Sequence, residues 1–230
     1  MKSEYLANIS HETKTPLAGI SSNIQLAREL YEDNSVGGKD GEIIAEALRQ
    51  AQEDILRVAR MGENSLWLAN IQNNTVQKKP IDTAIVLKNA AESYRNFIEK
   101  NGNTFTVKVA KVPMILASSD QLVHVIANIL TNTNTFTKNG RVAFEAWQET
   151  SFVKVTVTDS GRGIEPDMLP KVFQRGMSGS GSSGVGLAIC KDIIEAHNGV
   201  ISIMSDFGKG TTVTFLLPIY IESREAGSNV

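Results

Sequence analysis

Apolar and small residues in the first third of the chain recur in alternating steps of three and four, which is the spacing of one face of a helix. They form two runs, the first at Leu6, Ile9, Thr13, Pro16, Ile20, Asn23, Ala27 and Leu30, and the second at Ile44, Leu48, Ala51, Ile55, Val58, Gly62, Leu66 and Ala69. Turn-forming residues between positions 32 and 41 separate the two runs. We therefore predict a helical hairpin over residues 1–73.

The apolar stripe of the first helix is widened by Leu17, Ile24 and Tyr31. Two helices cannot bury stripes of this width against each other alone. A second copy of the hairpin would complete a four-helix bundle, so we predict a homodimer. The alternative is that the hairpin docks on the remainder of its own chain.

The pattern changes after residue 73. Residues 73–80 are polar and helix-breaking, which indicates a linker or a first edge strand. Period-two alternation predicts strands at 104–109, 114–117, 141–149, 152–158, 200–205 and 211–218, and helical spacing predicts helices at 82–100, about 119–130, 166–173 and 186–196. In the first of these helices Asp82 is the expected cap, and the expected buried positions are Ile85, Leu87, Ala91, Tyr94 and Ile98.

Helices that are segregated from mostly antiparallel strands favour an α+β fold. We predict that residues 74–222 form a two-layer α/β sandwich and that residues 223–230 are a polar tail.

Composition narrows the class of protein. The 230 residues are 41% hydrophobic and 21% charged, as in globular proteins, and a net charge of −2 gives no reason to expect nucleic-acid or membrane binding. No apolar run reaches the roughly 18–20 residues of a membrane span, and no signal peptide is recognisable. The single cysteine, Cys190, excludes an intrachain disulfide and lies in an apolar helical pattern, which predicts a buried structural thiol.

Candidate chemistry begins at His11. Thr15 lies four residues further on and therefore on the same helix face, and Glu12 is close enough to polarise or deprotonate the imidazole. Pro16 removes a helical hydrogen bond and allows the helix to bend. His11 lies outside the apolar stripe and points to solvent, where a lone histidine is usually inert. Its neighbours favour a catalytic role instead.

Two asparagines, Asn128 and Asn132, are four residues apart on the predicted helix that begins near 119. Side-chain amides offer an oxygen to a hard cation and a donor to a phosphate. Without further support, however, a helix with two solvated asparagines would be the favoured interpretation.

Two glycine-containing segments complete the candidate site. Asp159, Gly161 and Gly163 follow an apolar strand, where glycines permit the close approach of a flat ligand and a carboxylate suits an exocyclic amine such as that of adenine. Residues 179–186 are rich in glycine and serine and precede a helix, whose free N–H groups suit phosphates, although a plain loop has the same composition. The segment is not a P-loop, because no lysine follows the glycines, and it is not a Rossmann turn.

The order and spacing of these segments together are far more specific than any one of them. From about residue 4 to residue 218 the chain resembles the catalytic core of a bacterial two-component sensor histidine kinase, which joins a dimerisation and histidine-phosphotransfer domain to an ATP-binding domain. The matching motifs are the H-box at His11, the N-box at Asn128 and Asn132, the first glycine box at Asp159, Gly161 and Gly163, the F-box at Phe173, the second glycine box at Gly184, Val185, Gly186 and Leu187, and the following segment ending at Thr211.

The resemblance implies an ATP-dependent autokinase. ATP with Mg²⁺ would bind the second domain, with adenine against Asp159, the metal on Asn132 and a lid at residues 174–183. His11 would take the phosphoryl group with Glu12 as general base, and would pass it to an aspartate of a response-regulator receiver domain. Thr15 would position water for phosphatase activity.

The family likeness also implies a setting for the protein. It implies a cytoplasmic location and a homodimer, with no nucleic-acid partner and no membrane contact from this fragment. Because the chain begins ten residues before His11, we expect an upstream segment, and the full-length protein would then be a membrane-bound receptor with this chain as its cytoplasmic part.

Some positions depart from the family pattern. Thr135 stands where a basic residue is common, with Lys138 one turn away, and Gly176 follows Arg175 where a second aromatic residue is usual. Between Met177 and Gly186 there is no basic residue, so Arg175 and Lys171 are the nearest cations. We therefore predict activity with weakened ATP binding or a mobile lid.

Three alternatives stay open. The first is a degenerate regulatory dimer that binds nucleotide without autophosphorylation. The second is another ATPase of the superfamily of gyrase, MutL and heat-shock chaperones, which would not explain the H-box. The third is a response-regulator scaffold, which would have no need of the glycine boxes.

Overall fold

The computed structural model describes residues 17–31, 41–44, 46–48, 50–51, 55, 58, 77–175 and 184–221. The chain divides into two compact units, of which the first contains the helical residues up to position 58 and the second contains residues 77–175 and 184–221. The candidate residues His11, Glu12 and Thr15 lie outside the described part of the chain, as do most of the predicted lid and the polar tail.

In the first unit every described residue is helical, in agreement with the predicted hairpin. Among its described residues, Ala27, Ala47 and Ala51 are buried. Large apolar side chains remain exposed on both helical segments, at Leu17, Ile24, Leu26, Tyr31, Ile43, Leu48 and Ile55. Leu48 and Ile55 belong to the predicted seam, yet each is about half exposed, at 51% and 50%. A single hairpin thus leaves much of its apolar stripe uncovered.

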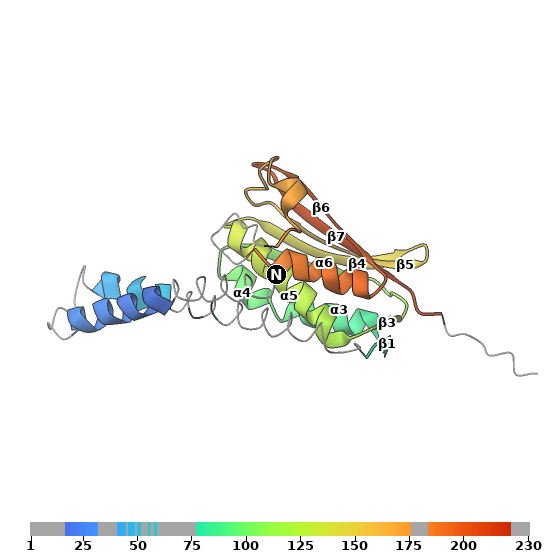
Figure 1. Cartoon of the computed structure of the whole chain (residues 1–230), viewed down its shortest axis with the longest axis horizontal. Helices are drawn as coiled ribbons and strands as arrows, with labels where there is room; N and C mark the ends of the chain where they lie inside the picture. The colour runs from blue at the N-terminus through green and yellow to red at the C-terminus, as the bar shows by residue number, and fades with distance from the viewer. Residues whose placement is uncertain are drawn as a thin grey trace, which may run out of the picture. The chain divides into compact units, whose positions relative to one another are not determined.

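The second unit is a two-layer α+β sandwich, which confirms the predicted fold class (Figure 1). Its strands are β1 (Lys79–Ile81), β2 (Thr104–Val109), β3 (Ile115–Ala117), β4 (Arg141–Glu149), β5 (Phe152–Asp159), β6 (Val200–Asp206) and β7 (Gly210–Pro218). Its helices are α3 (Thr83–Glu92), α4 (Arg95–Glu99), α5 (Ser119–Phe136) and α6 (Gly186–Ala196), with a short 3₁₀ helix, η1, at Leu169–Lys171.

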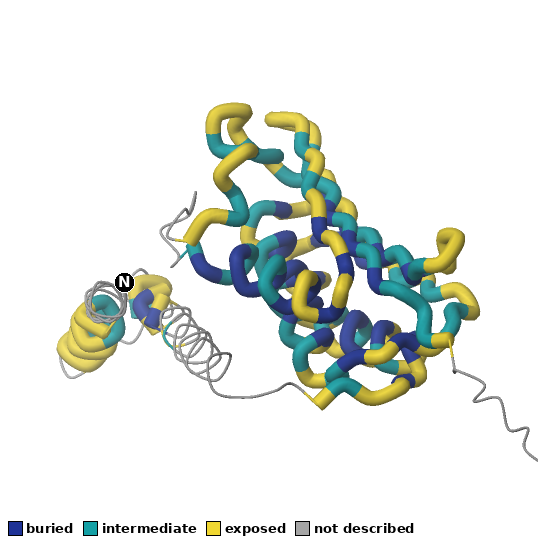
Figure 2. The backbone as a smooth tube through the Cα atoms, turned by 45° about the vertical axis from the view of Figure 1, so that its right-hand side comes forward, coloured by how far each residue is buried: buried dark blue, intermediate teal, exposed yellow. Residues whose placement is uncertain are grey.

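Five strands form the main sheet in the order β2-β4-β5-β7-β6, in which β2 and β4 are parallel and all other neighbours are antiparallel. Strands β1 and β3 form a separate antiparallel pair. The helices cover one face of the main sheet, and the buried residues in Figure 2 are concentrated between these two layers. No helix among the described residues is long and apolar enough to cross a membrane.

Strand alternation builds the core between the layers. Every second residue of the central strands points to the helices and is buried, at Val142, Phe144, Ala146, Val153, Val155, Val157, Val213, Phe215 and Leu217. The helices contribute fully buried side chains at the predicted positions Leu122, Val125, Ile126, Ile129 and Leu130. Cys190 is also completely buried, as predicted, and burial raises the pKa of its thiol to about 12, which disfavours the reactive thiolate.

The predicted helix over residues 82–100 is wrong as one element, because it breaks between α3 and α4. Asp82 is the cap as predicted, since its carboxylate accepts the Ile85 N–H at 3.0 Å. Ile85 itself is 57% exposed, however, and Tyr94 is only half-buried at the break. The predicted helix at 166–173 is likewise reduced to turns and η1, since Pro170 in its interior has no N–H to donate and its ring would clash with the carbonyl four residues earlier.

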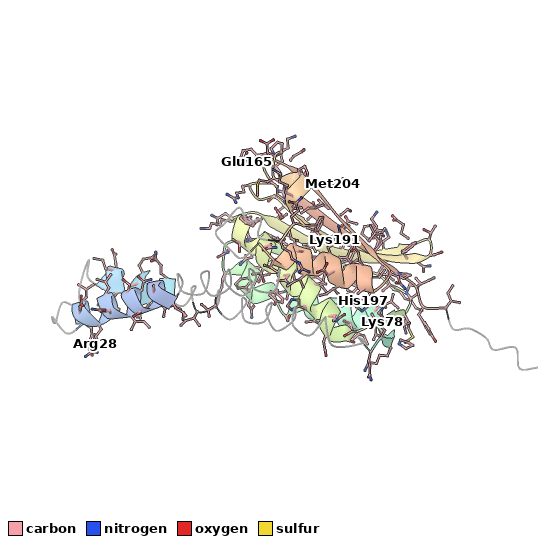
Figure 3. The ribbon with its side chains drawn as sticks, in the orientation of Figure 1. Arg28, Lys78, Glu165, Lys191, His197 and Met204 are labelled. Atoms are coloured by element: carbon pink, nitrogen blue, oxygen red, sulfur yellow. The ribbon has the colours of Figure 1, made fainter. Side chains whose placement is uncertain are left out.

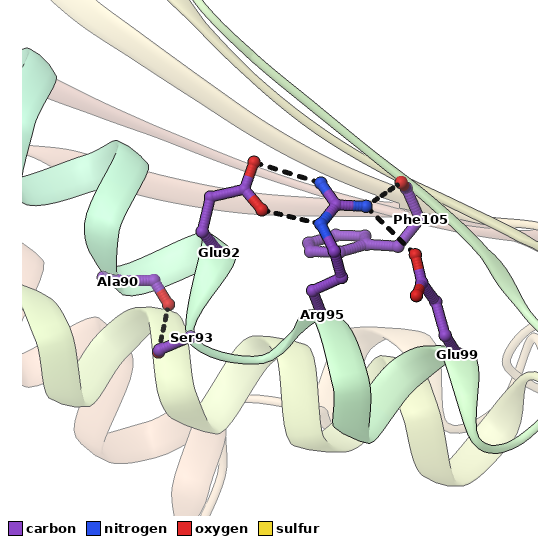
Figure 4. A network of polar contacts seen from close by, with 6 residues as sticks. All are labelled: Ala90, Glu92, Ser93, Arg95, Glu99 and Phe105. Carbon is purple, nitrogen blue, oxygen red and sulfur yellow. Dashed lines mark hydrogen bonds and ion pairs between the residues drawn. The ribbon is translucent and has the colours of Figure 1, made fainter.

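The break between α3 and α4 brings Arg95 over the outer edge of strand β2 (Figure 4). Its guanidinium donates to the Phe105 carbonyl oxygen at 2.8 Å and lies 5.3 Å from the centre of the Phe105 ring. It also pairs with Glu92 at 2.7 Å and Glu99 at 3.0 Å, and its hydrogen bond to Glu92 lowers the pKa of that carboxyl. Because an unpaired edge strand can pair with another chain, we infer that this cation protects the edge of the sheet.

His197 joins α5 to α6. Its Nδ1 lies 2.8 Å from the Ile193 carbonyl oxygen, and its Nε2 accepts the backbone N–H of Ser118, the residue before α5, at 3.1 Å. Lys78 lies beside it and donates to the Ala196 carbonyl oxygen (Figure 3). Burial and the Lys78 charge lower the pKa of His197, while the Ile193 carbonyl opposes this. The neutral imidazole is therefore the form that fits the fold.

This arrangement predicts a pH-dependent stability. Because the pKa of His197 is below the ordinary histidine value of 6.5, the unfolded chain binds more protons than the folded chain below that pH. Stability should therefore fall on acidification through this range, by at most about 1.4 kcal/mol per pH unit for one proton. Urea unfolding at several pH values gives the free energy of unfolding as a function of pH. This free energy should change less with pH in His197→Gln than in the wild type, and an equal pH dependence in the two proteins would contradict the assignment.

Candidate functional site

Asp159 is the last residue of β5 and occupies an inward position of its strand. Val155 and Val157 precede it in steps of two on the same buried face, so the strand period directs its carboxylate toward the helical layer. The residue is only 9% exposed. Burial raises the pKa of Asp159, whereas the hydrogen bond from the Gly161 N–H at 2.9 Å and the nearby Thr137 hydroxyl and Thr211 N–H oppose the shift. The site thus holds a carboxylate acceptor in a largely dry environment.

Gly161 and Gly163 occupy positions where no side chain fits. A Cβ on Gly161 would overlap the Phe136 carbonyl oxygen and lie 2.6 Å from the Thr137 hydroxyl and 2.9 Å from the Asp159 carboxylate. Gly163 has a φ of 68°, and a Cβ there would overlap the backbone of Asp206. The glycines therefore let the loop after β5 lie directly against α5 on one side and the β6–β7 turn on the other.

Thr211, at the start of β7, is the register partner of Asp159, so the sheet brings these two predicted residues together. Its hydroxyl lies 2.9 Å from that of Ser205, which also accepts the Ile164 N–H and donates to the Gly210 carbonyl oxygen, each at 2.9 Å. Ser205 was not predicted. It could have been found as a polar residue at an inward position of β6, after Ile201 and Ile203.

Asn128 and Asn132 lie on α5, and both are half-buried, while Ile126 and Leu130 face the core as predicted. The buried Nδ2 of Asn128 has no hydrogen-bond partner among the described residues. An unsatisfied buried donor is costly unless a ligand completes it. The Asn128 Nδ2 can therefore donate a hydrogen bond to a phosphate oxygen.

The second glycine segment lies next to Asn128. A Cβ on Gly186 would lie 3.2 Å from the Asn128 side-chain oxygen, so the first turn of α6 packs against this part of α5. Gly184 and Leu187 are half-buried beside it. The first N–H groups of an eleven-residue helix thus begin beside an unsatisfied amide, an arrangement that suits an anion.

Lys171, the first of the predicted cations, is the last residue of η1, and Phe173 and Arg175 follow it. Phe173 is half-buried, and Lys171 is exposed. Arg175 pairs with Asp192 of α6 at 2.7 Å, so its guanidinium is engaged by a carboxylate in this structure. Thr135 is exposed and donates to the Thr131 carbonyl oxygen at 2.9 Å. This position of α5 therefore presents a hydroxyl to solvent, where the family pattern has a positive charge.

The residues present fit ATP and Mg²⁺. Asp159 has remaining acceptor capacity for an amine, and the Asn128 nitrogen and the start of α6 offer donors to phosphates. Among the described residues no group of three or more histidine, cysteine, aspartate or glutamate side chains forms a metal cage. A Mg²⁺ held by one side-chain oxygen together with phosphate oxygens requires no such cage, so Asn132 remains the predicted ligand.

Two family models match this chain. The model for histidine kinase-, DNA gyrase B- and HSP90-like ATPases matches residues 117–221, and the model for the histidine kinase A phospho-acceptor domain matches residues 1–74. The signal transduction histidine-protein kinase BaeS of Escherichia coli is 29% identical over 95% of this chain and 47% of BaeS. The sensor protein SrrB of Staphylococcus aureus is 31% identical over 95% of this chain and 38% of SrrB. The chain thus spans less than half the length of these two relatives.

A solved structure supports the fold. Histidine kinase ThkA, in a crystal structure with the response regulator protein TrrA, matches with a TM-score of 0.70 and 18% identity over 96% of this chain and 63% of ThkA. A phospho-acceptor domain followed by an ATPase sandwich is the domain arrangement of a histidine kinase catalytic core. The chain belongs to the sensor histidine kinases, which confirms the resemblance inferred from its motifs.

Proposed function

We propose that this chain is an ATP-dependent protein-histidine autokinase that phosphorylates His11 and transfers the phosphoryl group to an aspartate of a response regulator. The observation that carries the proposal is the site between α5, α6 and the end of β5. It presents a buried carboxylate at Asp159 and an unsatisfied amide donor at Asn128 beside the start of a helix. Both features belong to the family's ATPase domain, and His11 lies in its phospho-acceptor domain.

The parts of α5 that contact the two glycine segments are well separated. Thr137, just beyond α5, lies near Gly161, and Asn128, nine residues earlier, lies near Gly186. Nine helical residues correspond to about 14 Å. In the proposal Asp159 accepts the amine of adenine at one end, while Asn128 and the first turn of α6 bind phosphates at the other. Asn132 would hold Mg²⁺, which would neutralise phosphate charge when bound.

The reaction is a phosphoryl transfer to nitrogen. A ring nitrogen of His11 forms a bond to the γ-phosphorus, the bond from that phosphorus to the β,γ-bridging oxygen breaks, and ADP leaves. Glu12 accepts or orients the ring proton, and the receiver aspartate later takes the phosphoryl group from the nitrogen. ThkA, which shares this fold, was crystallised with a response regulator, and this supports the proposed partner class. The need for ATP supports a cytoplasmic location.

The homodimer is part of the proposal. Leu17, Ile24 and Tyr31 on one helical segment and Leu48 and Ile55 on the next are exposed in the single chain, by 48–65%. A second hairpin packed on these side chains would bury them and complete a four-helix bundle. Thr15, one helical turn after His11, would position water for the dephosphorylation of the partner.

The proposal is tested by incubation with γ-labelled ATP and Mg²⁺. Wild-type protein should acquire acid-labile, base-stable label, and His11→Gln and Asn132→Ala should remove it, because one lacks the acceptor and the other the metal ligand. Thr15→Ala is the matched control on the same helix face, and should retain labelling while slowing dephosphorylation of a phosphorylated regulator. Nucleotide binding without any label in the wild type would favour the degenerate regulatory dimer instead.

A further inference from the structure

Two buried asparagines form an amide pair at the C-terminal end of α5. Asn103 precedes β2 and Asn134 lies in the last turns of α5, and they are only 4% and 3% exposed. The Asn103 Nδ2 donates to the Asn134 side-chain oxygen at 3.2 Å and to the Thr137 carbonyl oxygen at 2.9 Å. The Asn103 side-chain oxygen accepts the Gly140 N–H at 2.9 Å.

The pair is well satisfied for groups so deeply buried. Asn134 uses its own nitrogen to donate to the Phe97 carbonyl oxygen at 3.3 Å. Reversing the Asn103 amide would turn its nitrogen toward the Gly140 N–H, so the network determines the orientation of that group. Position 134 continues the apolar stripe of Ile126 and Leu130, where a leucine would fill the space without hydrogen bonds. A satisfied buried polar network of this kind favours one geometry over others.

The end of α5, which the amide pair holds, contacts the loop after β5 directly. Thr137 has its carbonyl oxygen bound by Asn103 and its hydroxyl near Asp159. One residue earlier, the Phe136 carbonyl oxygen accepts the Arg162 N–H at 3.2 Å. The Arg162 guanidinium lies 4.6 Å from the centre of the Phe136 ring. Since Gly161 has no room for even a Cβ at this contact, a shift of α5 here would displace the loop.

A second connection runs from the same pair to the other side of the loop. Gly140, whose N–H is bound by Asn103, is followed by Arg141, whose N–H donates to the Ser160 hydroxyl at 2.9 Å. In return the Ser160 N–H donates to the Arg141 carbonyl oxygen at 3.0 Å. The amide pair thus contacts both backbone segments between which Asp159 and Gly161 lie.

We propose that Asn103 and Asn134 are positioning residues for nucleotide binding, because they hold the end of α5 in the place that aligns Asp159 and Gly161 with the adenine. The inference rests on the proposed ATP site. A positioning role makes a prediction that a purely structural role does not. Loss of the pair should weaken adenine-nucleotide binding more than an equally destabilising substitution elsewhere in the chain does.

The test compares Asn134→Leu and Asn103→Ala with Val153→Ala in the full chain. Val153 is completely buried at the other end of β5, about 20 Å from Asp159 along the strand, and its truncation lowers stability away from the site. Urea midpoints calibrate the loss of stability in each variant. Both asparagine variants should raise the Kd for ADP and the KM for ATP by roughly 10-fold, with kcat changed far less, and Val153→Ala should leave all three near wild type.

Hydrogen exchange in nucleotide-free protein supplies a readout that needs no activity. The Arg162 N–H should lose protection in the asparagine variants and keep it in Val153→Ala, after correction for global stability. Equal effects of all three variants on Kd and on exchange would overturn the proposal. If wild-type protein bound no ADP, the proposed function would fail, and the exchange of Arg162 alone would then decide whether the pair positions the loop.

Discussion

Replacing Gly161 by alanine is expected to remove most of the kinase activity. The added methyl group would overlap the Phe136 carbonyl oxygen and lie within 2.6 Å of the Thr137 hydroxyl, and these atoms cannot move independently of α5. The loop must therefore shift, which should cost about 1–3 kcal/mol of stability. Displacing Asp159 from the adenine should slow autophosphorylation by on the order of 100-fold at a fixed ATP concentration. Both effects are measurable, by urea unfolding and by label incorporation.

Gly208→Asn is the matched control for this substitution. Gly208 has a φ of 83° in the β6–β7 turn, which asparagine tolerates better than other side chains do, and a Cβ there would meet no atom within 4 Å. The control should retain activity and stability close to wild type. Normal nucleotide binding by Gly161→Ala would show that the loop does not need its close contact with α5.

Asp159→Asn is expected to separate binding from folding. The substitution keeps the size of the side chain but places an amide nitrogen where the adenine amine should donate, so nucleotide affinity should fall by roughly 10- to 100-fold. The fold should remain, because burial already raises the pKa of Asp159 and disfavours its charge. Calorimetric titration with ADP, together with thermal unfolding, measures both quantities.

The same carboxylate predicts a pH dependence of binding. Its pKa lies above the ordinary aspartate value of 3.8, so protonation begins at a higher pH than for an exposed aspartate. Because only the ionised form accepts from the amine with both oxygens, ADP affinity should fall as the pH is lowered toward that pKa. Asp159→Asn has no proton to gain and should show a flatter profile. Parallel profiles for the two proteins would assign the titration to another group.

Much of the ATPase unit could be predicted because its periodic patterns are long. The buried positions of α5 and the alternation of β4, β5 and β7 follow directly from the spacing of apolar residues. Prediction was wrong where tertiary contacts override local spacing. The helix expected at 82–100 breaks so that Arg95 reaches the edge of β2, an interaction with a strand that begins nine residues later.

The residues of the candidate site also fall into two groups, those that lie in local motifs and those whose contacts depend on distant parts of the chain. Asp159, Asn128 and Thr211 were recognisable as candidates because each lies in a short local motif. Ser205 and Asn134 were missed, although each is a polar residue at a core-facing position of its element, which is a usable signal. Asn103 carries no such signal, because its role depends on Asn134, 31 residues away.

The sequence by itself determined the family, the fold class and the candidate residues of the proposed ATP site, since these depend on local patterns and on the order of motifs. Only the tertiary structure decided how those residues are held. Asp159 is buried because β5 and β7 pair in one register, and Gly161 is confined because α5 ends against it. Arg175 is paired with a carboxylate because α6 passes beside it. Such contacts join residues distant in the chain, and no local pattern specifies which of the many available partners the packing will select.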